Sequence, residues 1–229
     1  MTKFRLKFLA AAGALIGVGT PVSAELVVSQ MIVELSPVSR TADVLVFNDS
    51  EERTYVSIEP REVLNPGTTD EERVAKADPR DLGLLVSSAR FILEPRQKRL
   101  LRLAATSIPA QRERVYRVTV KPVVGDVDSA ASGLKLLVGY EMLVMVRPTN
   151  PGPVTIDGTR ANGELTLTNR GGASVELVDG RRCLADKVSC ASLPGKRLYA
   201  GAHWTQAVPQ GGRIEYRALS NGKSQMLNF

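Results

Sequence analysis

The side chains that could carry out chemistry are few in this sequence and do not converge. His203 is the only histidine among the 229 residues, and it stands beside the only tryptophan, Trp204. One histidine cannot supply a histidine-based metal site, and no Gly-x-Ser-x-Gly element offers a hydrolase nucleophile. The glycines lie in predicted turns and form no phosphate-binding loop. We therefore expect no enzyme, metal site or cofactor, and we interpret His203 as an ordinary strand residue.

Neighbouring carboxylates that could act as an acid and base pair occur in NPGTTDEERVAKADPRD, residues 65–81. The segment is polar and rich in turn residues. We interpret it as a long solvated loop, which explains the acidic residues better than catalysis does.

The remaining reactive side chains are two cysteines, Cys183 and Cys190. They do not form a Cys-x-x-Cys motif, so a redox role is disfavoured. In an oxidising compartment the two would form one local disulfide that closes a hairpin or loop, whereas two free buried thiols are the alternative.

The chain begins with a targeting signal. Lys3, Arg5 and Lys7 precede a short apolar run, which ends at Val22-Ser23-Ala24. This pattern predicts a secretory signal peptide over residues 1–24, because the apolar run is too short to span a bilayer. The mature chain would then begin near Glu25 and be exported, with no stable insertion in a membrane.

Removal of residues 1–24 lowers the net charge from +6 to +3, with 27 basic and 24 acidic residues left. No block of basic residues interleaved with aromatic residues is present, so nucleic-acid binding has no support. The 205 residues that remain suit two domains of about 100 residues each, or one large β domain.

Most of the mature chain reads as short strands bounded by turn residues, and no helical stripe of any length is present. Seven strands before residue 147 are typical of an immunoglobulin-like sandwich. The proline-rich segment 147–153 cannot continue a sheet and is the predicted boundary between domains 25–148 and 149–229. The predicted strands of the first domain, apart from the last, are LVVSQMIVEL, ADVLVFN, TYVSIEP, RFILEP, KRLLRLA and VYRVTVKPV; those of the second are PVTIDGT, GELTLTN, SVELVDG, HWTQAV and RIEYRAL.

The last strand of the first domain, GLKLLVGYEMLVMVRP at residues 133–148, has a period of two. Its even positions are all apolar, and its odd positions mix polar and charged residues with Leu137, Leu143 and Met145. A strand this apolar needs cover on both faces. Either both faces are buried within the chain's own sandwich, or the strand is offered to a partner.

Several segments together resemble the periplasmic chaperones of fimbrial assembly, which act with outer-membrane ushers. The resemblance lies in ADVLVFNDSEERTYVSIE, RFILEPRQKRLLRL, RERVYRVTVKPV and GYEMLVMVRP. VLNPGTTDEERV and GLLVSSARFILEP look closest to the alternate group that serves the colonisation-factor fimbriae of enteric bacteria, as does the cysteine pair. The resemblance spans nearly all of the mature chain.

The resemblance implies an all-β protein of two immunoglobulin-like domains in a boomerang arrangement. In this family the last long strand of the first domain completes a pilin subunit that lacks its own final strand, a mode known as donor-strand complementation. Counting back from Arg147, the side chains that would enter the subunit are Leu134, Leu136, Val138 and Tyr140, followed by Met142. These are the even positions of the periodic strand.

The family also implies an interdomain salt bridge, which here falls on Glu113 and Arg147, with Asn221 near the position of a third, acidic member. Separate solvated charges are the alternative for the first two. The basic residues that usually hold the subunit's terminal carboxylate are replaced by Ile32 and Leu143. The substitute candidates are Arg117 and Lys121, on one face of the preceding strand, and Arg147 itself.

We accordingly expect a periplasmic chaperone that binds pilin subunits and delivers them to an usher. Its partners would be major and minor pilins, a tip adhesin and the usher, and the free chain could cap itself as a dimer. The alternative is a secreted two-domain adhesin or fimbrial subunit, for which LVVSQMIVEL would be a donor extension. An intact seven-strand first domain argues against that alternative, because a pilin subunit would be one strand short.

Overall fold

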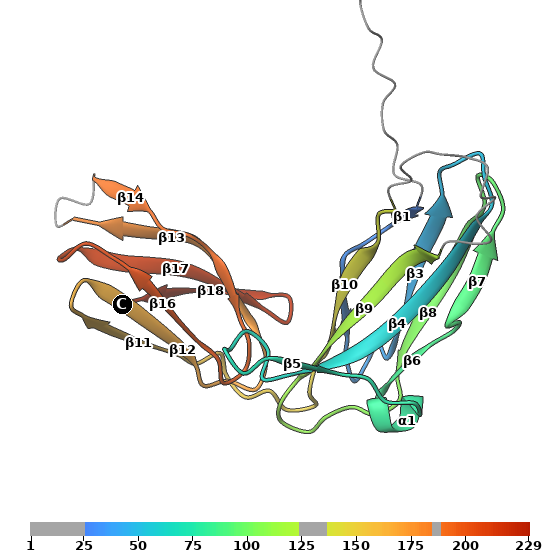
Figure 1. Ribbon diagram of the computed structural model, residues 1–229. Coiled ribbons are helices and arrows are strands. Elements are labelled where there is room, and N and C mark those ends of the chain that lie inside the picture. Colours follow the sequence, from blue (N-terminus) through green and yellow to red (C-terminus); the bar gives the residue numbers. More distant parts are fainter. Residues whose placement is uncertain (1–25, 124–136, 185–188) are drawn as a thin grey trace, which may run out of the picture.

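The computed structural model describes residues 26–123, 137–184 and 189–229. Two β-sandwiches meet at one end and diverge from there, like the arms of a boomerang (Figure 1). The expected all-β class with two immunoglobulin-like sandwiches is confirmed. Strands β1 to β10 build the first sandwich and β11 to β18 the second, and the proline-rich segment 147–153 lies between them.

The first sandwich consists of a four-stranded and a six-stranded sheet. In spatial order the four-stranded sheet contains β1 (Leu26–Val28), β3 (Thr41–Asn48), β8 (Lys98–Ala105) and β6 (Leu84–Val86). The six-stranded sheet contains β2 (Ile32–Leu35), β10 (Tyr140–Val146), β9 (Arg114–Val123), β4 (Thr54–Leu64) and β5 (Glu72–Val74), with β7 (Arg90–Leu93) also beside β4.

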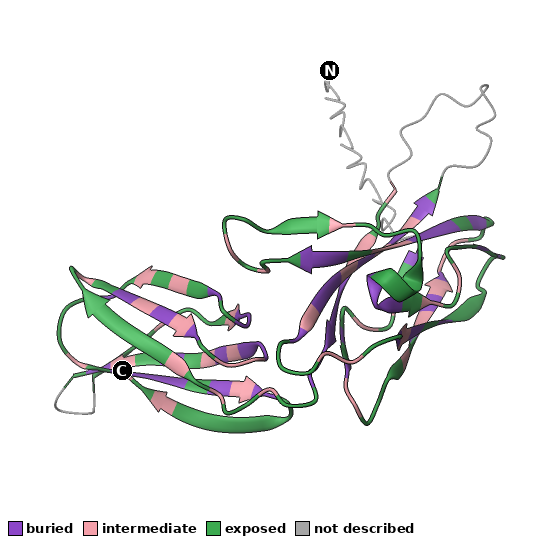
Figure 2. Ribbon diagram, turned by 90° about the horizontal axis from the view of Figure 1, so that it is seen from below, coloured by how far each residue is buried: buried purple, intermediate pink, exposed green. Residues whose placement is uncertain are grey.

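Period-two alternation fills the core between these two sheets. In β3, Val44 and Val46 are buried while Asp43 and Leu45 turn outward, and β8 buries Leu101 and Leu103 in the same way. Figure 2 shows the alternation as buried and exposed bands along the strands. Since successive side chains of a strand point to opposite faces, the sequence pattern alone sets which face is buried.

Two predicted segments of the first domain were assigned incorrectly. LVVSQMIVEL is not one strand, because the chain changes sheets within it: β1 pairs with β3, and β2 pairs with β10. The segment 65–81 is not a single loop, since it contains β5 and a one-turn helix, α1 (Pro79–Leu82). Asp78 caps α1 by accepting a hydrogen bond from the Arg80 backbone, and the left-handed Gly83 ends it.

The second sandwich pairs a three-stranded with a five-stranded sheet. The predicted strands are present, and β14, β15 and β18 are additional to them. The three-stranded sheet is β11 (Ile156–Ala161), β12 (Glu164–Asn169) and β16 (His203–Ala207); the other is β14 (Cys190–Ser192), β13 (Val175–Cys183), β17 (Arg213–Ser220) and β18 (Lys223–Asn228), with β15 (Lys196–Leu198) beside β13.

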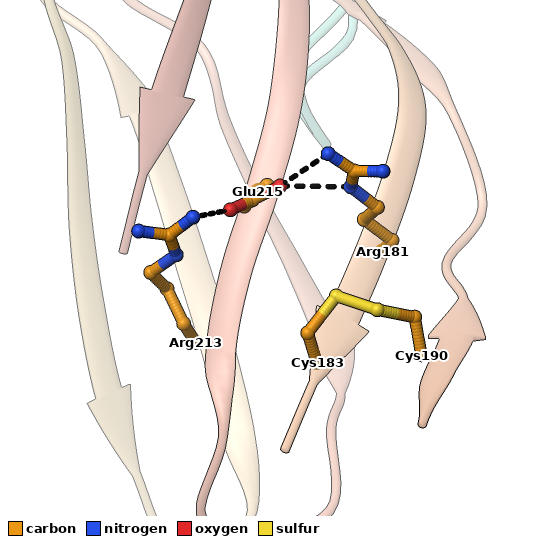
Figure 3. Close-up of a disulfide and its surroundings, with 5 residues drawn as sticks. All are labelled: Arg181, Cys183, Cys190, Arg213 and Glu215. Atoms are coloured by element: carbon orange, nitrogen blue, oxygen red, sulfur yellow. Dashed lines mark hydrogen bonds and ion pairs between the residues drawn. A yellow bond between two sulfur atoms is a disulfide. The ribbon is translucent and has the colours of Figure 1, made fainter. Parts of the chain in front are cut away.

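A disulfide between Cys183 and Cys190 joins β13 to β14 near the outer end of the second sandwich, so the predicted bridge is present and the thiols are not free. On the neighbouring strand β17, the carboxylate of Glu215 is held by Arg181 on one side and Arg213 on the other (Figure 3). These contacts tie the end of the β13–β14 hairpin to the centre of its sheet.

The two sandwiches share a hydrophobic cluster where they meet. Val63, Val115, Leu143 and Met145 leave the first sandwich on the face away from its own core and pack with the apolar residues of the second. Leu143 and Met145 are two of the odd-position residues of the periodic strand. The second sandwich therefore covers Leu143 and Met145 of β10, whose side chains point away from the core of the first sandwich.

Candidate functional site

Strand β10 has one edge that is only partly occupied. Along its full length it pairs antiparallel with β9, but β2 covers only Leu143–Val146 on the other side. Among the described strands, none pairs with that side of Tyr140–Met142. The Leu143 amide donates to the Met31 carbonyl across this edge. Because alternate residues point their main-chain groups to the same edge, the N–H and C=O of Glu141 face outward and can pair with an added strand.

The residues expected to enter a subunit lie before and at the start of this open edge. Leu134 and Leu136 are outside the described residues. Val138 is 43% exposed. Tyr140 is half-buried and packs against the first core. Exposed Ile32 of β2 and Met31 just before it flank the same edge, so the edge carries an apolar margin.

Met142 requires a correction. Its side chain is fully buried in the core of the first sandwich, together with Val144 and Val146. The even face of the strand thus changes its surroundings along the chain: near Val138 it is open to solvent, and from Met142 onward it fills the chain's own core. Met142 therefore stabilises the first domain and is not offered to a partner.

A charged surface lies beside the open edge, on the face of the six-stranded sheet that turns toward the second sandwich. We call it the cleft face; strand register places on it Glu59, Arg61, Arg117, Lys121 and Glu141. Lys121 Nζ lies 2.7 Å from Glu59 Oε1, and this partner lowers the pKa of Glu59. Arg117 Nε lies 4.0 Å from Glu141 Oε2, a much looser contact.

Of the two candidates on β9 for binding a subunit's terminal carboxylate, Arg117 and Lys121, Arg117 is the better placed. Leu143 has Ile32 as its neighbour on one side and Arg117 on the other, with Arg61 next in the same row. A basic group therefore lies one strand away from the position where the family usually has it. Lys121 lies farther from the hinge and is already paired with Glu59.

Arg147 is the junction between the two sandwiches. Its Nη1 donates to Glu113 Oε2 at 2.6 Å and to Ser174 Oγ at 2.9 Å, and Ser174 belongs to the second sandwich. The Arg147 and Glu113 side chains are only 6% and 1% exposed. The main chain adds a further tie, because the Glu113 amide donates to the Gly172 carbonyl at 2.8 Å.

The third member of this network is Glu34 on β2, which sequence reasoning missed. Arg147 Nη2 and Nε donate to the two Glu34 carboxylate oxygens at 2.7 and 3.3 Å, a bidentate arrangement. Asn221, near the expected third position, is instead a turn residue with φ of 51° between β17 and β18. The parallel pairing of β2 with β10 brings Glu34 to Arg147, and no local sequence signal marks such a pairing.

We predict that two buried carboxylates, Glu113 and Glu62, contribute to the free energy of unfolding with opposite dependence on pH. Burial raises the pKa of Glu113 although hydrogen bonds from Ser174 and the charge of Arg147 lower it. Burial also acts on Glu62, but bonds from Arg114 and Lys76 outweigh it and lower that pKa. A raised pKa stabilises the fold at acidic pH and loses that contribution as pH rises; a lowered pKa does the reverse.

The measurement is the unfolding free energy in urea, from pH 4 to pH 8, of the wild type, Glu113→Gln and Glu62→Gln. The wild type minus Glu113→Gln difference should fall as pH rises above the ordinary carboxylate range. The wild type minus Glu62→Gln difference should instead grow as pH rises from 4 into the ordinary carboxylate range and stay level above it. Parallel curves for the two variants would contradict the prediction.

The cleft face also carries an apolar groove, at the end far from the second sandwich. Exposed Tyr55, Ile92 and Val123 line it, and Phe91 lies beneath. Arg99 stacks over the Phe91 ring at 4.8 Å from its centroid. Sequence reasoning missed this groove, although Tyr55 and Val123 are bulky apolar residues at outward positions of their strands. The groove is formed by β4, β7 and the end of β9, and β9 is also the strand that separates it from β10.

Within the described residues, no group of three His, Cys, Asp or Glu side chains could hold a metal ion. No described helix is long and apolar enough to cross a membrane. The arrangement on the cleft face is suited to binding: an unpaired strand edge, apolar residues beside it, and a basic row behind it.

Comparison with known proteins gives three kinds of match. Residues 25–152 match the family model of the pili and flagellar-assembly chaperones, PapD N-terminal domain. A CFA/I fimbrial subunit of Escherichia coli is 27% identical over 151 residues, which span 63% of this chain and 63% of that protein.

Solved structures with the same fold include the class 5 fimbriae chaperone CfaA, with a TM-score of 0.72 and 23% identity over 89% of this chain and 97% of that one. The SafB chaperone of Salmonella enterica, solved in complex with the SafA pilin, has a TM-score of 0.63 and 17% identity over 92% of this chain and 98% of the matched one. These structural matches establish the fold.

Proposed function

This chain belongs to the pili and flagellar-assembly chaperones, and on that basis we propose that it binds pilin subunits at the open edge of β10 and delivers them to an outer-membrane usher. The observation that carries the proposal is the unpaired side of Tyr140–Met142 next to exposed Val138. A strand of a pilin added there would gain main-chain hydrogen bonds with little demand on its sequence.

Side chains at alternate positions would supply the apolar part of the interaction. We propose Leu134, Leu136, Val138 and Tyr140 for this role, because they share the face of Val138 in the period-two pattern. Burying one Leu-sized or Val-sized side chain contributes about 1.5–3 kcal/mol. Met142 is left out, since its side chain belongs to the first core.

For the terminal carboxylate of the pilin we propose Arg117, with Arg61 beside it on the cleft face. Arg117 lies next to Leu143, and its contact with Glu141 is long at 4.0 Å, so its guanidinium could bind an oxygen pair. Glu113, Arg147 and Glu34 would hold the two sandwiches in the orientation that this contact needs.

The bound subunits would be major and minor pilins and a tip adhesin, as in the solved chaperone complexes with a pilin or a tip adhesin. The expected signal peptide would bring the chain to the periplasm, with cleavage near Ala24. Neither a nucleotide nor catalysis is required, because a pilin completed by its neighbour's extension is packed more fully than one completed by the chaperone. The likeness to CfaA supports assignment to the colonisation-factor group.

The proposal is tested by co-expressing the chain with a pilin encoded beside it and purifying the chain from the periplasm. A soluble one-to-one complex is expected, and the pilin expressed alone should be degraded or aggregate. If the folded chain retains no pilin, the proposal that it binds pilins at this edge fails.

Delivery to the usher needs a second surface, because the pilin occupies the β10 edge. The Tyr55–Ile92–Val123 groove extends from the end of β9 over β4 to β7, on the side of β9 away from β10, and we assign this contact to it. We predict that Ile92→Glu retains the pilin to the same extent as the wild type but reduces surface fimbriae at least about tenfold, since a charge in an apolar contact costs more than 1.4 kcal/mol. Fimbriae counted on cells, beside pilin retention in the periplasm, separate the two steps. Loss of both together would contradict the assignment of the groove to the usher.

A further inference from the structure

The hairpin formed by β4 and β5 leaves the first sandwich and reaches the second (Figure 1). Its tip is Gly67, whose φ is 73°, and a Cβ atom placed there would lie 3.0 Å from Cδ2 of Tyr199. Tyr199 is a buried member of the cluster that joins the two sandwiches. The tip therefore lies against the second domain, through a residue at which even a Cβ atom would press on the Tyr199 ring.

One side chain from the other strand of the hairpin, β5, reaches across the sheet to β10. Arg73 on β5 donates to Glu141 Oε1 at 2.5 Å, across 68 residues of sequence. Glu141 is the residue whose main-chain N–H and C=O face the unpaired edge. The Arg73 contact thus restrains Glu141, the residue whose main chain an added strand would pair with.

The hairpin is held firmly at its base. Arg114 donates to both Glu62 carboxylate oxygens, at 2.7 and 2.8 Å, and Lys76 Nζ contacts the same carboxylate at 3.2 Å. At the turn, the Gly67 amide donates to Glu71 Oε2 at 2.8 Å. Since Glu62 and Val63 also pair with β9, these contacts fix the base of the hairpin to the six-stranded sheet, and a displacement at the tip would reach Arg73 along the turn.

We propose that the β4–β5 hairpin couples the second domain to the pilin-binding edge, with Gly67 on Tyr199 at one end and Arg73 on Glu141 at the other. Arg73 is then a positioning residue: it restrains the start of β10, where a strand frays most easily, in the conformation that accepts a partner. A change in the orientation of the second domain would move Tyr199 against Gly67 and so change how firmly Arg73 restrains β10. The inference rests on the proposed function only in naming this edge as the docking site.

The test is hydrogen exchange of the Tyr140–Val146 amides in the free protein, followed by mass spectrometry. Arg73→Ala should make the Tyr140 and Met142 amides, which face β9, exchange about twofold to fivefold faster, as expected for loss of a partly exposed ion pair. Gly67→Ala should do the same, although Gly67 lies at the far end of the hairpin. Tyr199→Leu removes the ring from the other side of that contact and serves as a second probe if Gly67→Ala folds poorly.

The matched control is Arg102→Ala, which removes an ion pair with Asp43 on the other sheet. Its exchange in β10 should equal that of the wild type, and an equal acceleration in this control would overturn the proposal. If Gly67→Ala and Tyr199→Leu leave the exchange rates in β10 equal to those of the wild type, the proposal is also overturned, because Arg73 would then act on β10 without any link to the second domain. These measurements need no pilin, so failed pilin retention by the wild type would refute the proposed function while leaving the coupling intact.

Discussion

Val138→Glu abolishes retention of a pilin while the purified chain remains folded; this is the largest functional effect that we expect. Val138 is 43% exposed in the free protein, so a glutamate there stays in water and costs the fold little. In the complex the same carboxylate would be buried among apolar side chains without a partner. That burial, with the lost apolar contact, should cost about 3 kcal/mol or more, which weakens binding at least a hundredfold.

The chain contains a matched control for this substitution. Val38 is 97% exposed in the turn between β2 and β3, so Val38→Glu introduces the same charge away from the open edge. Both variants are purified from the periplasm with a co-expressed pilin, and their thermal unfolding is compared with that of the wild type. Equal loss of pilin with the two variants would mean that the added charge alone, and not its position, weakens binding. If Val138→Glu unfolds, the Val138 side chain belongs to the chain's own core.

The period-two pattern of residues 133–148 predicts a strand and its apolar even face, and both are present where the strand is described, at Tyr140–Val146. The pattern could not show where the even face changes its surroundings. Val138 and Met142 are equally apolar in sequence, but only Met142 lies above β3 and β8 in the core. Nor could it show that Leu143 and Met145 pack against the second sandwich, because that contact depends on the orientation of a separate domain.

Two of the missed elements, β5 and α1, are too short to show a period. Strand β5 has three residues and α1 has four, so neither shows a repeat, and a polar segment of this composition is typical of a loop. Glu34 was missed for a different reason. It lies 113 residues before Arg147, and only the parallel pairing of β2 with β10 brings the two together. Contacts of this kind follow from topology, which a single sequence does not specify.

The largest effect on stability is expected for Arg147→Ala. The substitution leaves the Glu113 carboxylate, 1% exposed, without its guanidinium partner, and it leaves Ser174 without the donor that links the sandwiches. Removing one partner of a buried ion pair costs about 3–5 kcal/mol, most of it for the uncompensated charge. Urea unfolding of the purified protein at pH 7 measures this loss.

Because the cost arises from the stranded carboxylate, the double variant Arg147→Ala with Glu113→Ala should recover a large part of it. The surface pair of Arg53 and Glu94 is the control, since more than half of each side chain is exposed and Arg53→Ala should cost about 1 kcal/mol at most. If Arg147→Ala lowers the free energy of unfolding no more than Arg53→Ala does, the Glu113 carboxylate must be solvated in that variant. The two sandwiches would then have separated where they meet. Exchange of the Glu113 amide, which donates to Gly172 across the domain boundary, would then rise in the same variant. A large stability loss that the double variant recovers, with that amide still protected, would instead locate the cost in the ion pair itself.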